Sequence, residues 1–133
     1  MRVPMFRVPV LLAALLVAAP AFAQFGHPLK GTWGGDWGPS KDRQMHVLLA
    51  FEWDGKALSG TINPGPNGVT MQKVTLDAPA WAVHVEAEGK DASGQAVKYV
   101  LDGKLENIGA YQRILSGTWT EGTVKGTFRV VRN

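Results

Sequence analysis

Histidines and carboxylates are the side chains of this sequence that could do chemistry, and His84 and Glu86 form the most suggestive pair. They lie two positions apart in a segment that alternates apolar and polar residues, so both occupy the same face of a strand. An imidazole beside a carboxylate could begin a metal site or an acid/base pair. No third ligand follows at a matching spacing. We therefore interpret His84 and Glu86 as a solvated surface pair rather than as part of a metal centre.

The other candidate bases, nucleophiles and phosphate-binding loops give weaker indications of a functional site. His46 has the outward parity of its strand, while Ser59 and Ser116 only precede Gly-Thr steps. The glycine-rich segment 31–38 is interrupted by two tryptophans and is followed by no helix, although a phosphate cradle needs a helix N-terminus. No nucleophile elbow, Walker loop or dinucleotide motif occurs. We therefore expect a protein that is not an enzyme and holds no metal and no cofactor.

Eight segments with a two-residue period must position these side chains. In segment 44–53, for example, Val47 and Leu49 share one face while His46 and Glu52 share the other. Turn signals such as Asp54-Gly55 separate the segments. The predicted strands are 29–37, 44–53, 57–63, 69–76, 81–89, 96–106, 111–120 and 123–132, with a bulge at Gln72-Lys73 where the alternation changes phase. No segment keeps a helical period.

A Gly-Thr step followed by a bulky apolar residue recurs inside four of these strands. The four steps begin at Gly31, Gly60, Gly117 and Gly126. Residues two apart share a face, so each glycine lets the sheet bend where a large neighbour fills the enclosed space. Short connections imply consecutive antiparallel strands. The sequence therefore predicts an all-β fold, an eight-stranded antiparallel up-and-down barrel.

The first 23 residues have the three parts of a secretory signal peptide. Arg2 and Arg7 precede an apolar stretch at 8–19, and Ala21-Phe22-Ala23 precedes a cleavage site before Gln24. The apolar stretch is shorter than the ~20 residues that cross a bilayer. We expect a signal peptide at 1–23, a single domain at 24–133, no membrane span, and a destination in the periplasm or outside the cell.

The charge of the chain offers little support for nucleic-acid binding. The whole sequence has 14 Lys+Arg against 11 Asp+Glu, a net charge of +3. Arg2 and Arg7 belong to the leader, which has no acids, so the mature part has 12 basic and 11 acidic residues, or +1. We expect no nucleic-acid partner. The chain has no cysteine, so disulfides and thiol chemistry are excluded.

Several motifs resemble the calycins, the superfamily of up-and-down barrels that includes lipocalins and avidins. They are Gly31-Thr32-Trp33, the hairpin sequence 54–61 and the arginine of the last strand. The resemblance implies that Trp33 plugs one barrel end and that Arg132 lies over it, where a cation–π contact could form. Avidin's biotin-holding aromatic, asparagine and tyrosine correspond here to Gly34, Gly35 and Ile62, so the resemblance does not extend to biotin.

The aromatic residues fall into two groups if successive strands alternate in direction. One end should hold Trp53 and Trp81 beside Trp33 and Arg132. The other end could form a ligand-binding mouth, because tryptophan and methionine make adaptable apolar contacts. The predicted ligand-binding residues are Trp37, Met45, Met71, Tyr99 and Trp119.

Two functional hypotheses follow from a barrel of this size. The first is an exported binding protein that holds a small apolar or amphipathic ligand in its interior or at its mouth. The second is a filled-core structural or protein-interaction module that works through its outer face or its loop at 63–68. Eight-stranded barrels are compatible with both, because they are either just filled by side chains or hold one small ligand.

Overall fold

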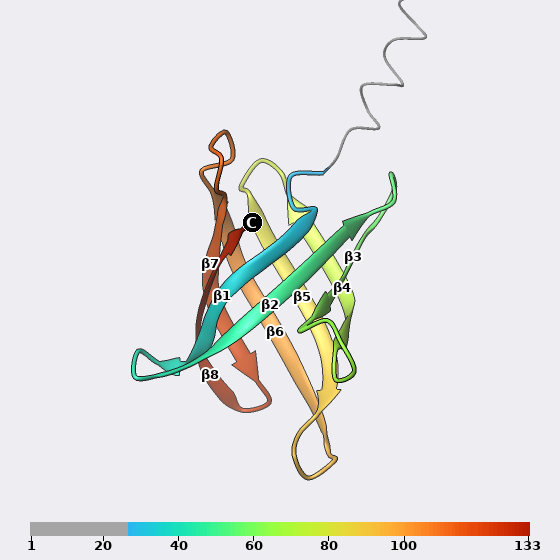
Figure 1. Ribbon diagram of the computed structural model, residues 1–133, viewed down its shortest axis with the longest axis vertical. Coiled ribbons are helices and arrows are strands. Elements are labelled where there is room, and N and C mark those ends of the chain that lie inside the picture. Colours follow the sequence, from blue (N-terminus) through green and yellow to red (C-terminus); the bar gives the residue numbers. More distant parts are fainter. Residues whose placement is uncertain (1–26) are drawn as a thin grey trace, which may run out of the picture.

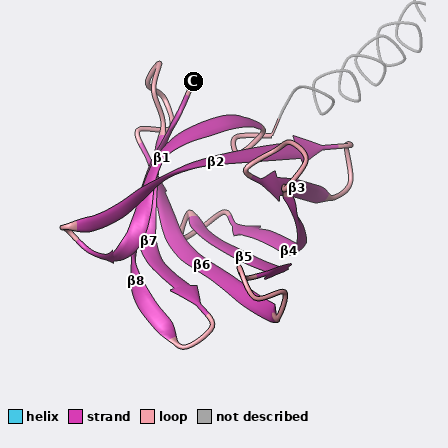
Figure 2. Cartoon of the chain, turned by 60° about the horizontal axis from the view of Figure 1, so that its bottom comes forward, coloured by secondary structure: helices cyan, strands magenta, loops and turns pink. Residues whose placement is uncertain are grey.

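Alternating polarity and glycine-permitted bending produce a closed antiparallel barrel in the computed structural model, which describes residues 27–133 (Figures 1 and 2). Each strand pairs with the next, and β8 pairs with β1. The strands are β1 (Gly31–Ser40), β2 (Arg43–Trp53), β3 (Leu58–Ile62), β4 (Val69–Asp77), β5 (Ala82–Lys90), β6 (Ala96–Glu106), β7 (Ile114–Glu121) and β8 (Val124–Arg132). This confirms the predicted fold class, whereas the predicted signal peptide at 1–23 lies outside the described residues.

The barrel has two ends that differ in what they carry. The upper end in Figure 1 holds loops 54–57, 78–81 and 107–113 together with the C-terminus. The lower end holds turns 41–42 and 122–123 and loops 63–68 and 91–95. Between residues 27 and 133 there is no helix long and apolar enough to cross a bilayer.

Two predicted strand boundaries are wrong by three residues. β1 continues through Pro39 to Ser40, where a turn was expected, because the ladder with β2 shifts register between Trp37 and Ser40. A proline without an N–H is tolerated at such an irregularity. Tyr111, predicted to begin a strand, lies in the loop before β7 and is 97% exposed. Arg113 holds that loop by donating hydrogen bonds to the carbonyl oxygens of Ile108 and Pro28.

The predicted bulge in the fourth strand is confirmed. Met71 is opposite Ala87, but Lys73 is opposite Glu86, so Gln72 is an extra residue on β4. A bulge bends its strand and increases the local twist. The bulge lies close to the point where the pairing of β4 with β3 ends, because that pairing includes only Thr61 with Thr70 and Ile62 with Val69.

Inward-facing side chains fill the barrel with one apolar core. Its largest fully buried members are Trp33, Phe51, Leu29, Leu49, Ile62, Leu101, Leu115, Val47, Val85 and Val130. Neighbouring strands approach closely at two of the Gly-Thr steps. A Cβ on Gly117 would fall on the carbonyl oxygen of Asp102, and one on Gly126 would fall on that of Gly38. The glycines therefore permit the backbones of neighbouring strands to approach.

Candidate functional site

Three aromatic rings from β1, β6 and β7 meet inside the lower end of the barrel. Trp37 and Tyr99 stack with ring centroids 5.6 Å apart and an interplanar angle of 4°. Trp119 packs against the same indole at a centroid distance of 5.6 Å and an angle of 41°. We call these three residues the aromatic cluster. The structure thus brings together three of the five residues that the sequence suggested for ligand binding.

The two methionines of the predicted site lie at the same end but differ in burial. Met71 is 6% exposed, and its sulfur lies close to Gly60. Met45 is the register partner of Trp37 and is 57% exposed. Val124, next to the β7–β8 turn, is 46% exposed. The rim below the aromatic cluster therefore presents flexible and exposed apolar side chains, which can repack around a ligand.

The indole N–H of Trp119 is buried and has no hydrogen-bond acceptor in the described part of the chain. Trp33 shows the usual arrangement, because its Nε1 donates to the carbonyl oxygen of Leu29 at 2.8 Å. A buried donor without a partner costs about 1–3 kcal/mol, so such groups require an explanation. The aromatic cluster therefore contains a donor that an incoming acceptor could satisfy.

The hydroxyl of Tyr99 is partly buried and lies near negatively charged side chains. Burial raises the pKa of the Tyr99 hydroxyl, and the charges of Glu121 and Asp91 raise this pKa further. Glu121 is the register partner of Tyr99 across the β6–β7 ladder. Each of these effects disfavours additional negative charge.

A hollow of about 560 Å³ lies at the lower end between the start of β4 and the end of β5, lined by residues 67–70 and 88–91 and by none of the aromatic cluster. Gly89 forms part of its wall. A Cβ at this position would lie 3.2 Å from the Tyr99 ring and 2.9 Å from Val69. The absence of a side chain at Gly89 therefore leaves the edge of the Tyr99 ring close to this hollow.

The residues predicted to plug the other end lie together near the start of β1. Trp33 is fully buried, packs edge-on against Phe51 at 6.5 Å and is the register partner of Arg132. The Nε of Arg132 donates to the carbonyl oxygen of Lys30 at 2.8 Å. Among residues 27–133 the structure shows no cation–π contact between this guanidinium and Trp33.

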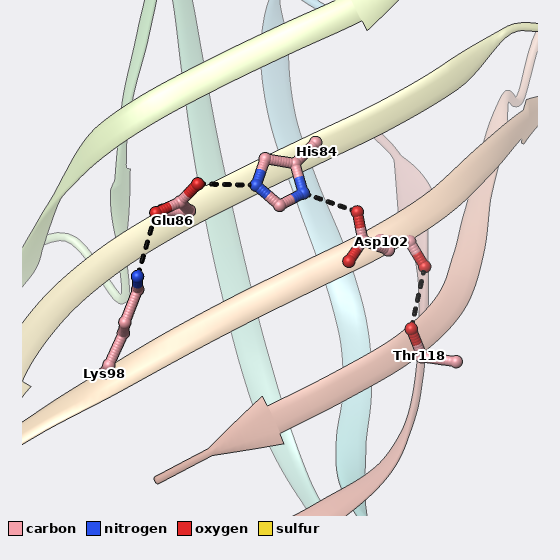
Figure 3. Close-up of polar contacts among 5 residues, drawn as sticks. All are labelled: His84, Glu86, Lys98, Asp102 and Thr118. Atoms are coloured by element: carbon pink, nitrogen blue, oxygen red, sulfur yellow. Dashed lines mark hydrogen bonds and ion pairs between the residues drawn. The ribbon is translucent and has the colours of Figure 1, made fainter.

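On the outer face, His84 lies between two carboxylates (Figure 3). Its Nδ1 is 2.5 Å from Oδ1 of Asp102, and its Nε2 is 2.8 Å from Oε2 of Glu86. Lys98 extends the row, with its Nζ 3.1 Å from Oε1 of Glu86. Hydrogen bonds to Asp102 and then Glu86 raise the pKa of His84, and the contacts with His84 and Lys98 lower the pKa of Glu86 to about 2.

This network is arranged as a salt bridge rather than as a metal centre. The two carboxylates approach opposite nitrogens of one imidazole ring, so the three side chains do not converge on a point. No cluster of metal-binding side chains is found in the described range. A shallow groove of about 410 Å³ beside it includes His84, Asp102 and Thr118. Each ring nitrogen of His84 therefore lies within hydrogen-bond distance of one carboxylate oxygen.

Sequence reasoning found His84 and Glu86 but missed Asp102. Asp102 lies 18 positions away in sequence and becomes a neighbour only through the pairing of β5 with β6. The sequence contains the information needed to predict this contact, because the turn at Ser93-Gly94 sets the register that places His84 opposite Asp102. The expected surface pair is thus part of a four-residue row.

Comparison with known proteins does not assign this chain to a family. Comparison of the chain with protein-family models, with curated proteins and with solved structures finds no match. The eight-stranded antiparallel barrel fits the calycin fold in its coarse architecture.

Proposed function

We propose that this protein is an exported, calycin-like, non-catalytic binding protein whose ligand is a small, neutral, amphipathic molecule. The ligand enters at the lower end of the barrel and contacts the aromatic cluster. The observation that carries the proposal is the buried indole N–H of Trp119, for which residues 27–133 supply no acceptor. A ligand with one acceptor oxygen would receive that hydrogen bond, while its apolar part would pack on Trp37 and Tyr99.

The charge at this end supports a neutral ligand. Glu121 and Asp91 act on the Tyr99 hydroxyl and disfavour an anion there. A carbonyl or ether oxygen accepts from the Trp119 indole without bringing charge. A hollow of about 560 Å³ at the same end has the size of a small-molecule site, but its lining, residues 67–70 and 88–91, is separate from the cluster.

Binding at this position requires side chains at the lower end to move. Trp37 and Trp119 are 5% and 2% exposed, and their rings pack against each other. Met45 and Met71 are unbranched thioethers that can change rotamer at low cost. The ligand then takes the place of methionine or ring contacts.

The outer-face chemistry supports a non-catalytic role. Both nitrogens of His84 are engaged by carboxylates, so this histidine offers no free lone pair to act as a general base. Its raised pKa strengthens that argument, because the imidazolium form is favoured.

The proposal is tested by titrating the protein with three probes of similar length, which are 2-octanone, octane and octanoate. We expect 2-octanone to change tryptophan fluorescence and to raise Tm in a saturable way. Octane should bind more weakly because it has no acceptor, and octanoate should bind more weakly because of its charge. The matched control is Trp119→Phe, which keeps a ring but removes the N–H, so the preference for the ketone over octane should disappear. No saturable response to 2-octanone would reject the proposal.

A filled-core interaction module is the second candidate, and the burial of the cluster favours it. Trp37 and Trp119 already pack against other rings, as in a barrel whose interior is filled by side chains. In that case none of the three probes should raise Tm. Trp119→Ala would then change only stability and leave every probe response at zero.

A further inference from the structure

The upper half of β4 is a sheet edge without a partner strand in the described chain. The ladder between β3 and β4 ends at Thr61 with Thr70, yet β4 continues to Asp77. β3 has only five residues, and the bulge at Gln72 redirects β4 just beyond the last pair. The two strands diverge above the loop that joins them (Figure 1).

The free edge runs from Lys73 to Asp77 and has a self-complementary sequence. Lys73, Thr75 and Asp77 are exposed, whereas Val74 and Leu76 face inward and are only partly buried. If two copies of this segment run antiparallel with Thr75 opposite Thr75, each Lys73 faces an Asp77 of the other copy. The same register places Val74 opposite Leu76. Charge and apolar positions therefore match under a two-fold axis.

The charges at this edge are available for such pairing. Between residues 27 and 133 the structure shows no ion pair made by Lys73 or Asp77. Glu86, the register partner of Lys73 on β5, is already engaged by His84 and Lys98. A lysine and a bulge commonly protect a free edge against unwanted strand addition. Here that protection is lifted by a partner strand with a carboxylate opposite the lysine.

We propose that two copies of this chain form a homodimer through antiparallel pairing of their β4 edges over residues 73–77, with Thr75 at the two-fold axis. Main-chain hydrogen bonds supply attraction, as in other cases of strand addition. The charge pairs Lys73 with Asp77 select the register. An edge of five residues buries little area, so the dimer is weak and salt-sensitive. The proposal is independent of ligand binding at the lower end.

Charge exchange tests the pairing. Sedimentation velocity of the purified protein at low salt should show a monomer–dimer equilibrium. Lys73→Asp and Asp77→Lys each place like charges opposite one another twice, so each should weaken the dimer about tenfold to a hundredfold. The double variant Lys73→Asp/Asp77→Lys should restore it, because the reversed charges again match. A mixture of the two single variants should form a heterodimer, whereas each alone stays largely monomeric.

A single introduced thiol tests the axis itself, since the chain has no cysteine. Thr75→Cys should form a disulfide-linked dimer under mild oxidation, because the Cα atoms of directly opposite residues lie about 4.5–5.5 Å apart, within the range that a disulfide spans. Thr70→Cys is the matched control, being an exposed threonine of the same strand that is paired with β3 and should not cross-link. A protein that is monomeric at all concentrations would overturn the proposal. A dimer unaffected by either charge variant and not cross-linked through position 75 would overturn it as well.

Discussion

Nδ1 of His84 lies 2.5 Å from Oδ1 of Asp102 on the neighbouring strand. Nε2 of the same ring is 2.8 Å from Glu86, so both ring nitrogens face carboxylates. A neutral imidazole has only one N–H, and both contacts are satisfied as donors only by the imidazolium form. The barrel surface therefore holds a histidine whose charge is part of the fold.

This arrangement makes part of the stability depend on pH. The folded-state pKa of His84 is raised above 6.5. Its contribution is therefore fully present below about pH 6.5 and is lost as the pH rises through the folded-state value. The Tm difference between wild type and His84→Gln should be larger at about pH 5.5 than at about pH 8.5. Equal differences at both values would show that the imidazolium contributes nothing. Asp102→Asn should lower the pKa of His84 measured by NMR titration.

The bend at Gly117 should tolerate no side chain. A Cβ there would meet the carbonyl oxygen of Asp102, so Gly117→Ala must push two strands apart. We expect a loss of about 1–3 kcal/mol or more in the free energy of unfolding, measured by denaturant titration. Gly109→Ala is the matched control, because nothing lies within 4 Å of its added Cβ. If both variants were equally stable, curvature would not explain the Gly-Thr steps.

Trp33 should contribute more to stability than any exposed aromatic residue. It is fully buried and its indole donates to Leu29. Trp33→Ala should cost about 3–5 kcal/mol through a cavity and a lost hydrogen bond. Tyr111→Ala should change stability by less than about 0.5 kcal/mol, because Tyr111 is 97% exposed. Thermal melts of the two variants compare them directly, and a Trp33→Ala protein as stable as wild type would contradict the packing.

Tyr99 should report the environment of the aromatic cluster at alkaline pH. Its folded-state pKa is raised above 10.0, first by burial and then by Glu121 and Asp91. The stability that this provides is present below about pH 10 and is lost as the pH rises through the folded-state value. Wild type should therefore lose stability relative to Tyr99→Phe as the pH passes about 10. Phenolate absorbance should also lose its late-titrating part in that variant, and an unchanged titration curve would refute the assignment.

Much of this fold could be predicted because its information is local. The alternation of apolar and polar residues along segment 44–53 predicts that Val47 faces inward and His46 faces outward. A shift of the strand register by one residue would exchange the inward and outward positions of every side chain. The bulge at Gln72 was visible as a change of phase. The predicted end of β1 is wrong, because Pro39 is a turn signal in the sequence but an irregular strand residue in the barrel.

The candidate site was only partly predictable because it depends on contacts across strands. Strand direction placed Trp37 and Trp119 at one end, but the ring stacking with Tyr99 follows from side-chain packing. The unpartnered N–H of Trp119 has no sequence signature, since the same residue type finds an acceptor at Trp33. Predicting the contact between Asp102 and His84 requires the register of β5 with β6, in addition to knowing that both side chains face outward.

Ligand binding at the aromatic cluster can be followed directly by NMR of the indole proton of Trp119, with its resonance assigned by its loss in Trp119→Phe. Titration with 2-octanone should move this resonance downfield in a saturable way as the N–H gains an acceptor, and octane should not reproduce the shift. An indole resonance that stays unchanged at saturating 2-octanone would contradict ligand binding at the aromatic cluster.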